Sequence, residues 1–237
     1  MSVFIVEKEP KSPVTEAYRT LRTNIQFSSF DSDLKSILVT SSGPAEGKST
    51  TIGNIAFTMA QAGKKVVLID CDLRKPSIHK KFSISNKIGL SDYLVGEALL
   101  EEVIVKYNDN LSIIPSGTIP PNPAEMISSN KMKNFIEQCK EEYDCVLVDA
   151  PPVIAVTDAQ ILSTFIDGVL LVIASAQADK DAATKAKDLL VNVKANIIGV
   201  VLTKAKSKSG YGYGYGYGYG YYYGEEDNKK GKRKKKK

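Results

Sequence analysis

Six short apolar runs alternate with helical patterns along this chain, and that arrangement leaves few folds open. We expect strands at 35–41, 64–70, 110–117, 143–150, 168–175 and 196–203, because each is a nearly continuous apolar run of strand length. Helical patterns at about 14–28, 48–63, 124–141 and 179–193 separate these strands, and 77–105 is typical of short helices. The sequence therefore predicts an α/β fold, with a doubly wound, mostly parallel sheet that is covered on both faces.

The alternating pattern stops after Thr203. The tail from Lys204 onward carries a net charge of +8, although the whole chain carries only +5, so the first 203 residues are slightly acidic. The tail also holds eight of the twelve tyrosines, interleaved with glycine in a pattern that cannot bury a core. We therefore expect one domain, 1–204, and a disordered tail, 205–237. Because the basic charge belongs to the tail, no folded nucleic-acid-binding face is expected.

Composition excludes two further classes of protein. No window approaches eighteen consecutive apolar residues, and the N-terminus has neither a basic region nor a long apolar stretch. The sequence thus predicts no transmembrane helix and no signal peptide. The three cysteines form no C-x-x-C pair, which favours buried thiols in a reducing cytosol.

The segment "SSGPAEGKST" (41–50) joins the first strand to the first long helix after it. This is the setting of a phosphate-binding P-loop, whose amides face the phosphates at a helix start. Gly47 would let the backbone turn close to the phosphates, Lys48 would reach the β- and γ-phosphates, and Ser49 would hold Mg²⁺. Ser42 replaces the usual first glycine, which makes this a P-loop NTPase with a deviant Walker A. The predicted nucleotide-binding residues are Ser42, Gly43, Pro44, Ala45, Glu46, Gly47, Lys48, Ser49 and Thr50.

Aspartates end two further strands. Asp70 and Asp72 close "VVLIDCD", and Asp149 closes "CVLVDAPP". Ligands of open α/β sheets bind at the carboxyl ends of the strands, so these carboxylates are candidates to hold a metal or orient a hydroxyl. A helix cap or a surface acid is the alternative at each position. The late strand continues as "VLTKAKS" without an Asn-Lys-x-Asp motif, which favours ATP over GTP.

Together, the deviant Walker A, "VVLIDCDLRKP" and "CVLVDAPP" resemble the bacterial tyrosine kinases. The helix segment "EAYRTLRTN" and the C-terminal tyrosine cluster extend the resemblance to the whole chain. Ala45 stands where the family often has glycine, so one loop torsion is open to change. The three nucleotide motifs alone are shared with a wider group of deviant P-loop ATPases. In partition and septum-placing ATPases a signature lysine stands five positions before the P-loop lysine, where this chain has Gly43.

The resemblance implies a protein-tyrosine kinase that uses ATP and Mg²⁺, of the Gram-positive type that governs capsule or exopolysaccharide synthesis and export. It implies three partners: a transmembrane activator that regulates polysaccharide chain length, a tyrosine phosphatase, and further copies of the chain in a ring, an octamer in the family. The kinase would be cytoplasmic, held at the inner face of the cell membrane by the activator. Glu16, Arg19 and Arg22 would make the ring contacts, although their spacing also suits an intrahelical ladder of ion pairs.

Within this hypothesis each acidic residue has a role. Asp70, from its place in the second aspartate motif, would orient the acceptor hydroxyl and accept or relay its proton. Lys48 would stabilise charge on the phosphates, and Asp72 and Asp149 would help Ser49 to hold Mg²⁺. Asp70, Lys48, Asp72 and Asp149 are thus the predicted catalytic residues. Arg74 is either an additional cation near the site or a surface arginine.

The tail offers acceptors for such a kinase. Glycine between the phenols removes bulk, and a flexible tail would carry them roughly 15 to 25 Å from Lys204. That reach allows delivery in cis or in trans, and the resemblance favours trans. The predicted phosphoacceptors are Tyr211, Tyr213, Tyr215, Tyr217, Tyr219, Tyr221, Tyr222 and Tyr223.

Three other interpretations of the chain stay open. The first is a membrane-associated positioning or partition ATPase, and the second is an ATP-binding scaffold without catalysis. The third treats the tail alone as a low-complexity, self-associating segment. The lysine block of the tail could also rest on anionic lipid or simply remain in solvent.

Overall fold

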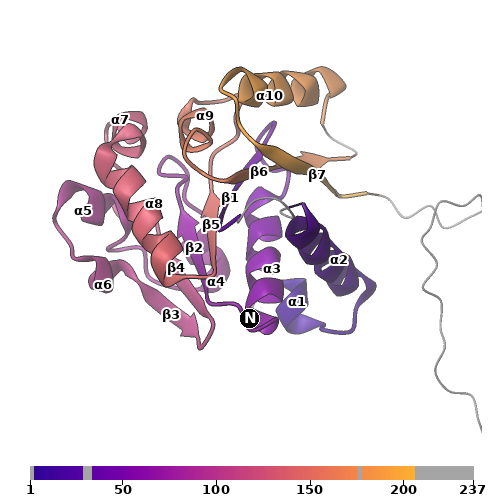
Figure 1. Cartoon of the computed structure of the whole chain (residues 1–237), viewed down its shortest axis with the longest axis horizontal. Helices are drawn as coiled ribbons and strands as arrows, with labels where there is room; N and C mark the ends of the chain where they lie inside the picture. The colour runs from indigo at the N-terminus through magenta and orange to yellow at the C-terminus, as the bar shows by residue number, and fades with distance from the viewer. Residues whose placement is uncertain (1–2, 29–33, 176–177, 206–237) are drawn as a thin grey trace, which may run out of the picture. The chain divides into compact units, whose positions relative to one another are not determined.

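The computed structural model describes residues 3–28, 34–175 and 178–205 (Figure 1). Within these ranges the centre of the fold is a seven-stranded sheet in the order β3-β4-β2-β5-β1-β6-β7. All neighbours pair in parallel except β3 and β4, so the predicted sheet type is confirmed. The strands are β1 (Ser36–Ser41), β2 (Val66–Asp70), β3 (Val105–Asn108), β4 (Leu111–Ile114), β5 (Cys145–Asp149), β6 (Gly168–Ala174) and β7 (Ile197–Thr203).

Helices cover both faces of the sheet (Figure 1). One face packs against α1 (Ile5–Lys8), α2 (Pro13–Phe27), α3 (Lys48–Gln61) and α4 (Ile78–Phe82). The other packs against α5 (Leu90–Val95), α6 (Leu100–Val103), α7 (Pro123–Ser128), α8 (Asn130–Glu142), α9 (Asp158–Leu162) and α10 (Lys180–Asn192). No helix in the described ranges is both long and apolar enough to cross a membrane.

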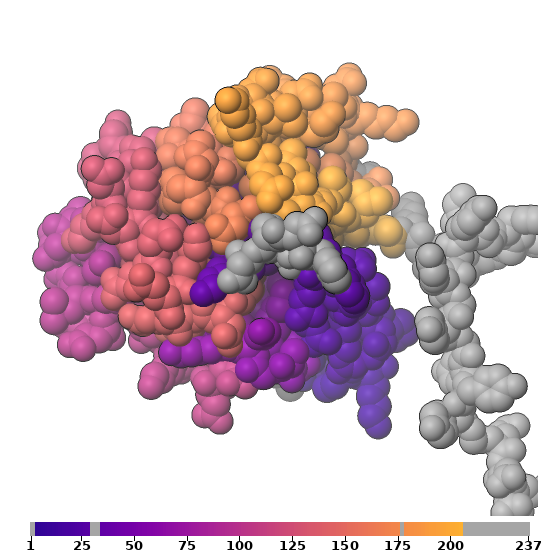
Figure 2. Space-filling model, in the orientation of Figure 1, coloured from indigo at the N-terminus to yellow at the C-terminus, as the bar shows by residue number. Residues whose placement is uncertain are grey.

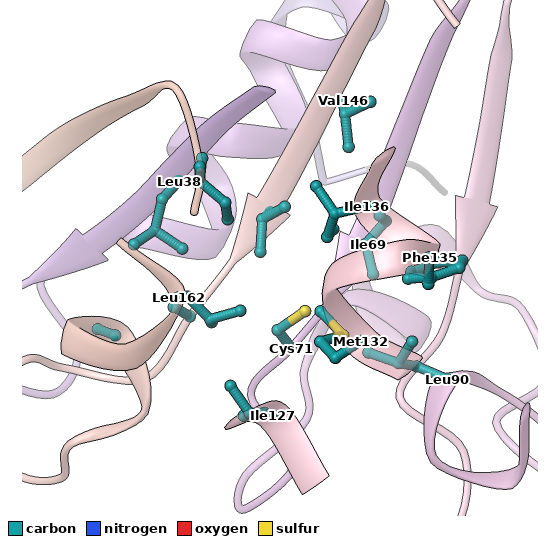
Figure 3. Close-up of a cluster of buried hydrophobic side chains, with 14 of the residues drawn as sticks. Leu38, Ile69, Cys71, Leu90, Ile127, Met132, Phe135, Ile136, Val146 and Leu162 are labelled. Atoms are coloured by element: carbon teal, nitrogen blue, oxygen red, sulfur yellow. The ribbon is translucent and has the colours of Figure 1, made fainter. Parts of the chain in front are cut away.

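The central strands are buried at every position, because helices shield both sides of them. All residues of β1, β2 and β5 are buried, which explains why these strands are continuous apolar runs in the sequence. Figure 3 shows the second face, where Ile69 and Val146 of the sheet lie near Phe135 and Ile136 of α8. Cys71 belongs to the same cluster, and all three cysteines are buried and free, as predicted.

Local chemistry corrects several predicted boundaries. The helix expected at 124–141 is two helices, because Ser129 has extended backbone and its hydroxyl accepts the N–H of Met132 as the N-cap of α8. Strand β3 and helices α1 and α9 were not predicted; each has only four or five residues, too few to show a period. Gly63 ends α3 in a left-handed turn, as expected.

The apolar side chains of α2 are only partly covered. Ile25 is buried, but Val14 is 53% exposed. This helix and the edge strand β7 line a groove of about 460 Å³, and Val200 and Leu202 of that strand are also largely exposed. Figure 2 shows the C-terminal end of the fold, in yellow, beside the indigo N-terminal segment that contains α2. The tail beyond Ala205 lies outside the described residues, so its predicted disorder stays a prediction.

Candidate active site

The P-loop connects the end of β1 to the first turn of α3. Its backbone enters the left-handed region twice, at Ala45 (φ 59°) and at Gly47 (φ 96°). The alanine therefore keeps the torsion that a glycine would adopt, at a cost of roughly 1 kcal/mol. A pocket of about 460 Å³ opens beside the loop. It is lined by Ser41, Gly43, Pro44, Ala45, Glu46, Gly47, Lys48, Ser49, Thr50, Asp72, Lys75, Ser77, Lys81, Pro152 and Lys204.

Two hydrogen bonds to Glu46 close the loop at the deviant start of the motif. Ser42 Oγ donates a hydrogen bond of 2.5 Å to Glu46 Oε1, and the Gly43 N–H donates one of 3.1 Å to the same oxygen. Glu46 thus braces the two ends of the loop across the turn. Among the predicted nucleotide-binding residues, Ser42 alone does not line the pocket. Its hydroxyl stabilises the loop through the hydrogen bond to Glu46.

A lysine and two aspartates meet at the floor of the pocket, where Lys48 and Asp72 line it and Asp149 is fully buried outside the lining. Lys48 Nζ lies 3.1 Å from Asp149 Oδ1 and 3.2 Å from Asp72 Oδ2. Ser49 Oγ donates a hydrogen bond of 2.7 Å to Asp149 Oδ2. The sheet order explains the convergence, because β5 lies between β2 and β1 and sets Asp149 directly beside Asp70 in register. Three carboxyl-terminal strand ends therefore deliver these side chains to one place.

Burial and charge shift the acid–base behaviour of this cluster. Burial alone would lower the pKa of Lys48, but the charges of Asp149, Asp72 and Asp70 outweigh it and raise that pKa. Burial raises the pKa of Asp149, against the opposing pull of Lys48 and Ser49. Burial and the Asp149 charge together raise the pKa of Asp70 to about 7. The ammonium of Lys48 is the main counter-charge for this acidic floor.

Asp70 occupies a different setting from the one predicted. It is fully buried and does not line the pocket. Its two carboxylate oxygens accept the N–H groups of Asp72 (3.2 Å), Ser77 (3.1 Å) and Ile78 (3.0 Å). In this arrangement Asp70 shapes the loop that presents Asp72. Its predicted role as proton acceptor stays a prediction.

The donor set suits a magnesium ion. Ser49, Asp72 and Asp149 offer oxygen ligands, and the lysine ammonium that lies among them shows that the place favours a cation. No group of three or more His, Cys, Asp and Glu side chains among the described residues could enclose a metal. Two carboxylates and a hydroxyl are nevertheless typical of Mg²⁺, which takes its other ligands from water and substrate phosphates.

Several other predicted residues are engaged elsewhere. Arg74 forms a two-pronged ion pair with buried Asp158 and is not part of the pocket lining, so its role as an additional cation near the site stays a prediction. Glu16 and Arg19 pair within α2, as the ion-pair alternative proposed. Arg22 instead donates a 2.8 Å hydrogen bond to the carbonyl of Thr58. The eight tail tyrosines lie outside the described residues.

Sequence reasoning did not assign several residues at the site. Lys75 and Lys81 line the pocket, and Lys81 Nζ donates a 3.0 Å hydrogen bond to Thr50 Oγ1. Thr203 and Lys204 contact the P-loop from the end of β7. Lys75 lies within the motif "VVLIDCDLRKP", but only the folded chain shows that it and the other three residues reach the loop.

Comparison with known proteins assigns this site to a family. A family model described as an AAA domain matches residues 34–197. The chain is 46% identical to the tyrosine-protein kinase YwqD of Bacillus subtilis over 199 residues, which cover 84% of each protein. It is 38% identical to the putative tyrosine-protein kinase CapB of Staphylococcus aureus, over 86% of this chain and 90% of CapB. The chain belongs to the bacterial tyrosine kinases.

The solved structures agree with this assignment. The crystal structure of the chimerical protein CapA2B2 superimposes on this kinase-family chain with a TM-score of 0.81 at 40% identity, over 84% of this chain and 88% of the chimera. The resemblance inferred from the motifs is confirmed at the level of family and fold.

Proposed function

We propose that this chain is an ATP-dependent, autophosphorylating protein-tyrosine kinase that transfers the γ-phosphate of ATP to tyrosines of its own C-terminal tail. The observation that carries the proposal is the convergence of Lys48, Ser49, Asp72 and Asp149 beside a P-loop pocket. That arrangement stands in a chain whose relatives are named tyrosine-protein kinases. The tyrosine-rich tail follows Lys204, which itself lines the pocket.

The side chains divide the chemistry between them. Bound Mg-ATP would supply the phosphoryl group and a metal charge that offsets the phosphates. Lys48 would exchange its carboxylate partners for phosphate oxygens, while Ser49, Asp72 and Asp149 would hold the metal. The first-turn amides of α3, which have no acceptor within the helix, would donate to the phosphates. Catalysis of this type depends on positioning and charge stabilisation rather than on a covalent intermediate.

The acceptor hydroxyl needs a proton acceptor or relay, because a phenol with a pKa of about 10 is almost fully protonated at neutral pH. Asp70 is our candidate because of its place in the second aspartate motif; burial and the Asp149 charge also raise the pKa of its carboxyl group to about 7. Asp70→Asn should abolish tyrosine phosphorylation and leave Mg-ADP binding measurable. Wild-type rates of phosphorylation in that variant would remove Asp70 from the mechanism.

The assembly and its regulation belong to the same proposal. By family resemblance, tails act in trans within a ring of copies, an octamer, in which Glu16, Arg19 and Arg22 make contacts. A transmembrane activator would hold the kinase at the inner face of the membrane, with anionic lipid as a further contact of the tail, and a phosphatase would reverse the reaction. The output would be control of capsule or exopolysaccharide synthesis. Light scattering after size-exclusion chromatography, with Arg19→Ala as the test variant, would measure the ring.

Intact mass spectrometry after incubation with Mg-ATP tests the central proposal. A ladder of roughly 80 Da steps should appear in the wild-type chain. It should be absent from Lys48→Arg and from a variant whose eight tail tyrosines are all changed to phenylalanine. If no ladder forms, the assay is repeated with source-cell membranes to supply an activator. Steady ADP release without phosphotyrosine under both conditions would instead support a positioning ATPase.

A further inference from the structure

The end of strand β7 holds the P-loop by two side-chain hydrogen bonds. Thr203 Oγ1 donates one of 2.6 Å to the carbonyl oxygen of Glu46. Lys204 Nζ donates one of 2.8 Å to the carbonyl oxygen of Ala45. The partners lie 157 and 159 residues apart in the sequence, so the contacts exist only in the folded chain.

These contacts fall on the part of the loop whose backbone torsions are least favourable, because a non-glycine residue there has a positive φ. Ala45 has a φ of 59°, a left-handed torsion that glycine adopts freely and alanine does not. Gly47 follows at 96°, and the Thr203 side chain lies 3.5 Å from the point where a Cβ of Gly47 would be. A strained torsion persists only where its surroundings hold it, and Thr203 and Lys204 supply that hold.

The hydrogen bonds also fix the direction of two amides. A trans peptide is planar, so the carbonyl of one residue and the N–H of the next point in opposite directions from one rigid plane. The Lys204 bond to the Ala45 carbonyl therefore orients the N–H of Glu46. The Thr203 bond to the Glu46 carbonyl orients the N–H of Gly47 in the same way. Both N–H groups belong to the loop that lines the pocket.

We infer that Thr203 and Lys204 are positioning residues for the nucleotide phosphates. They hold the peptide planes of Ala45–Glu46 and Glu46–Gly47 so that the amides of this loop face the phosphate position. The inference rests on the proposed nucleotide function of the P-loop, but it does not depend on tyrosine as the acceptor. It also ties the root of the C-terminal tail to the nucleotide site, because Lys204 is the first residue after β7.

Calorimetric titration of the full chain with Mg-ADP tests this role. Thr203→Val keeps the shape of the side chain and removes the donor, so ADP affinity should fall about fivefold. Thr203→Ser keeps the hydroxyl and should retain wild-type affinity. Thr184→Val is the matched control, since the Thr184 hydroxyl donates to the Lys180 carbonyl within its own helix, and the ADP affinity of this variant should not change. A merely structural role would lower the melting temperature of Thr203→Val without weakening ADP binding, and that outcome overturns the inference.

A second background tests the link to loop strain. Ala45→Gly removes the energetic cost of the left-handed torsion, so the loop depends less on the hydrogen bonds from Thr203 and Lys204. In that background Thr203→Val should weaken ADP binding less than about twofold. An equal fivefold loss in both backgrounds would show that the threonine does not act through Ala45. A wild-type chain that binds no ADP would refute the proposed function itself, which separates that failure from the failure of this inference.

Discussion

Replacement of Lys48 by methionine should destabilise the fold, beyond any effect on phosphoryl transfer. The ammonium lies between Asp149, which is fully buried, and Asp72, which is only 6% exposed. Removing one partner of a buried ion pair typically costs 3–5 kcal/mol, because a buried charge is left uncompensated. We expect Lys48→Met to lower the free energy of unfolding by about 3 kcal/mol at pH 8 in magnesium-free buffer.

The loss should depend on pH in a defined direction. Burial and neighbouring charge already raise the pKa of Asp70 to about 7, and burial raises the pKa of Asp149; loss of the lysine raises both pKa values further. A carboxyl group whose pKa is raised in the folded state contributes stability at low pH and loses it as the pH rises through that pKa. The difference between wild type and Lys48→Met should therefore shrink by roughly 2 kcal/mol between pH 8 and pH 6.

Urea unfolding at the two pH values, followed by circular dichroism, measures both quantities. Lys81→Met is the matched control, because Lys81 also lines the pocket but donates to the hydroxyl of Thr50. That variant should lose less than about 1 kcal/mol at either pH. If Lys48→Met were as stable as wild type at pH 8, or equally destabilised at both pH values, the lysine would not be neutralising this acidic floor.

Three further predictions concern residues outside the pocket. Gly53→Ala should destabilise the fold by about 2 kcal/mol, because the new Cβ would lie 2.1 Å from the Phe4 ring. In the Gly53→Ala background, Phe4→Ala should cost less stability than it does in the wild type, because it removes this clash. Urea midpoints measure both effects, and strictly additive losses would contradict the prediction. Arg74→Ala should cost about 3 kcal/mol by leaving buried Asp158 unpaired, and a thermal shift below 2 °C would contradict this. Asp167 is half-buried, and hydrogen bonds from Lys140 and Ser36 outweigh the effect of burial and lower its pKa. The stability that this carboxylate contributes is therefore present above about pH 4 and lost below it. The difference in unfolding free energy between wild type and Asp167→Asn should vanish in acid titration.

The main architecture was readable in the sequence because it follows from local physics. Continuous apolar strands such as β1 and β5 alternate with helices, and only a parallel sheet covered on both faces buries such strands. The P-loop was visible for the same reason, since its glycine, lysine and serine are neighbours in the chain. Boundaries were less certain: the break at Ser129 depends on a single cap, and β3 forms only where β4 is available as a partner.

The roles of the acidic residues were only partly readable. The strand ends placed Asp72 and Asp149 near the loop, and both meet Lys48 there. The sequence could not show that Asp70 is occupied by three backbone amides, because those amides belong to the chain reversal that follows β2. It also could not distinguish Arg74 as a partner of Asp158 from Arg74 as a cation near the site, since 84 residues separate the two.

The sequence by itself determined the kind of sheet, the phosphate loop and the family, because periodicity and short motifs are properties of adjacent residues. The tertiary structure decided which groups surround the loop. These are the two carboxylates that contact Lys48, the Glu46 carboxylate that accepts the N–H of Gly43, and the Thr203 and Lys204 side chains that donate to the strained turn. Hydrogen bonds and ion pairs act over only a few ångströms, so chain separation says nothing about them until the strands are ordered in the sheet.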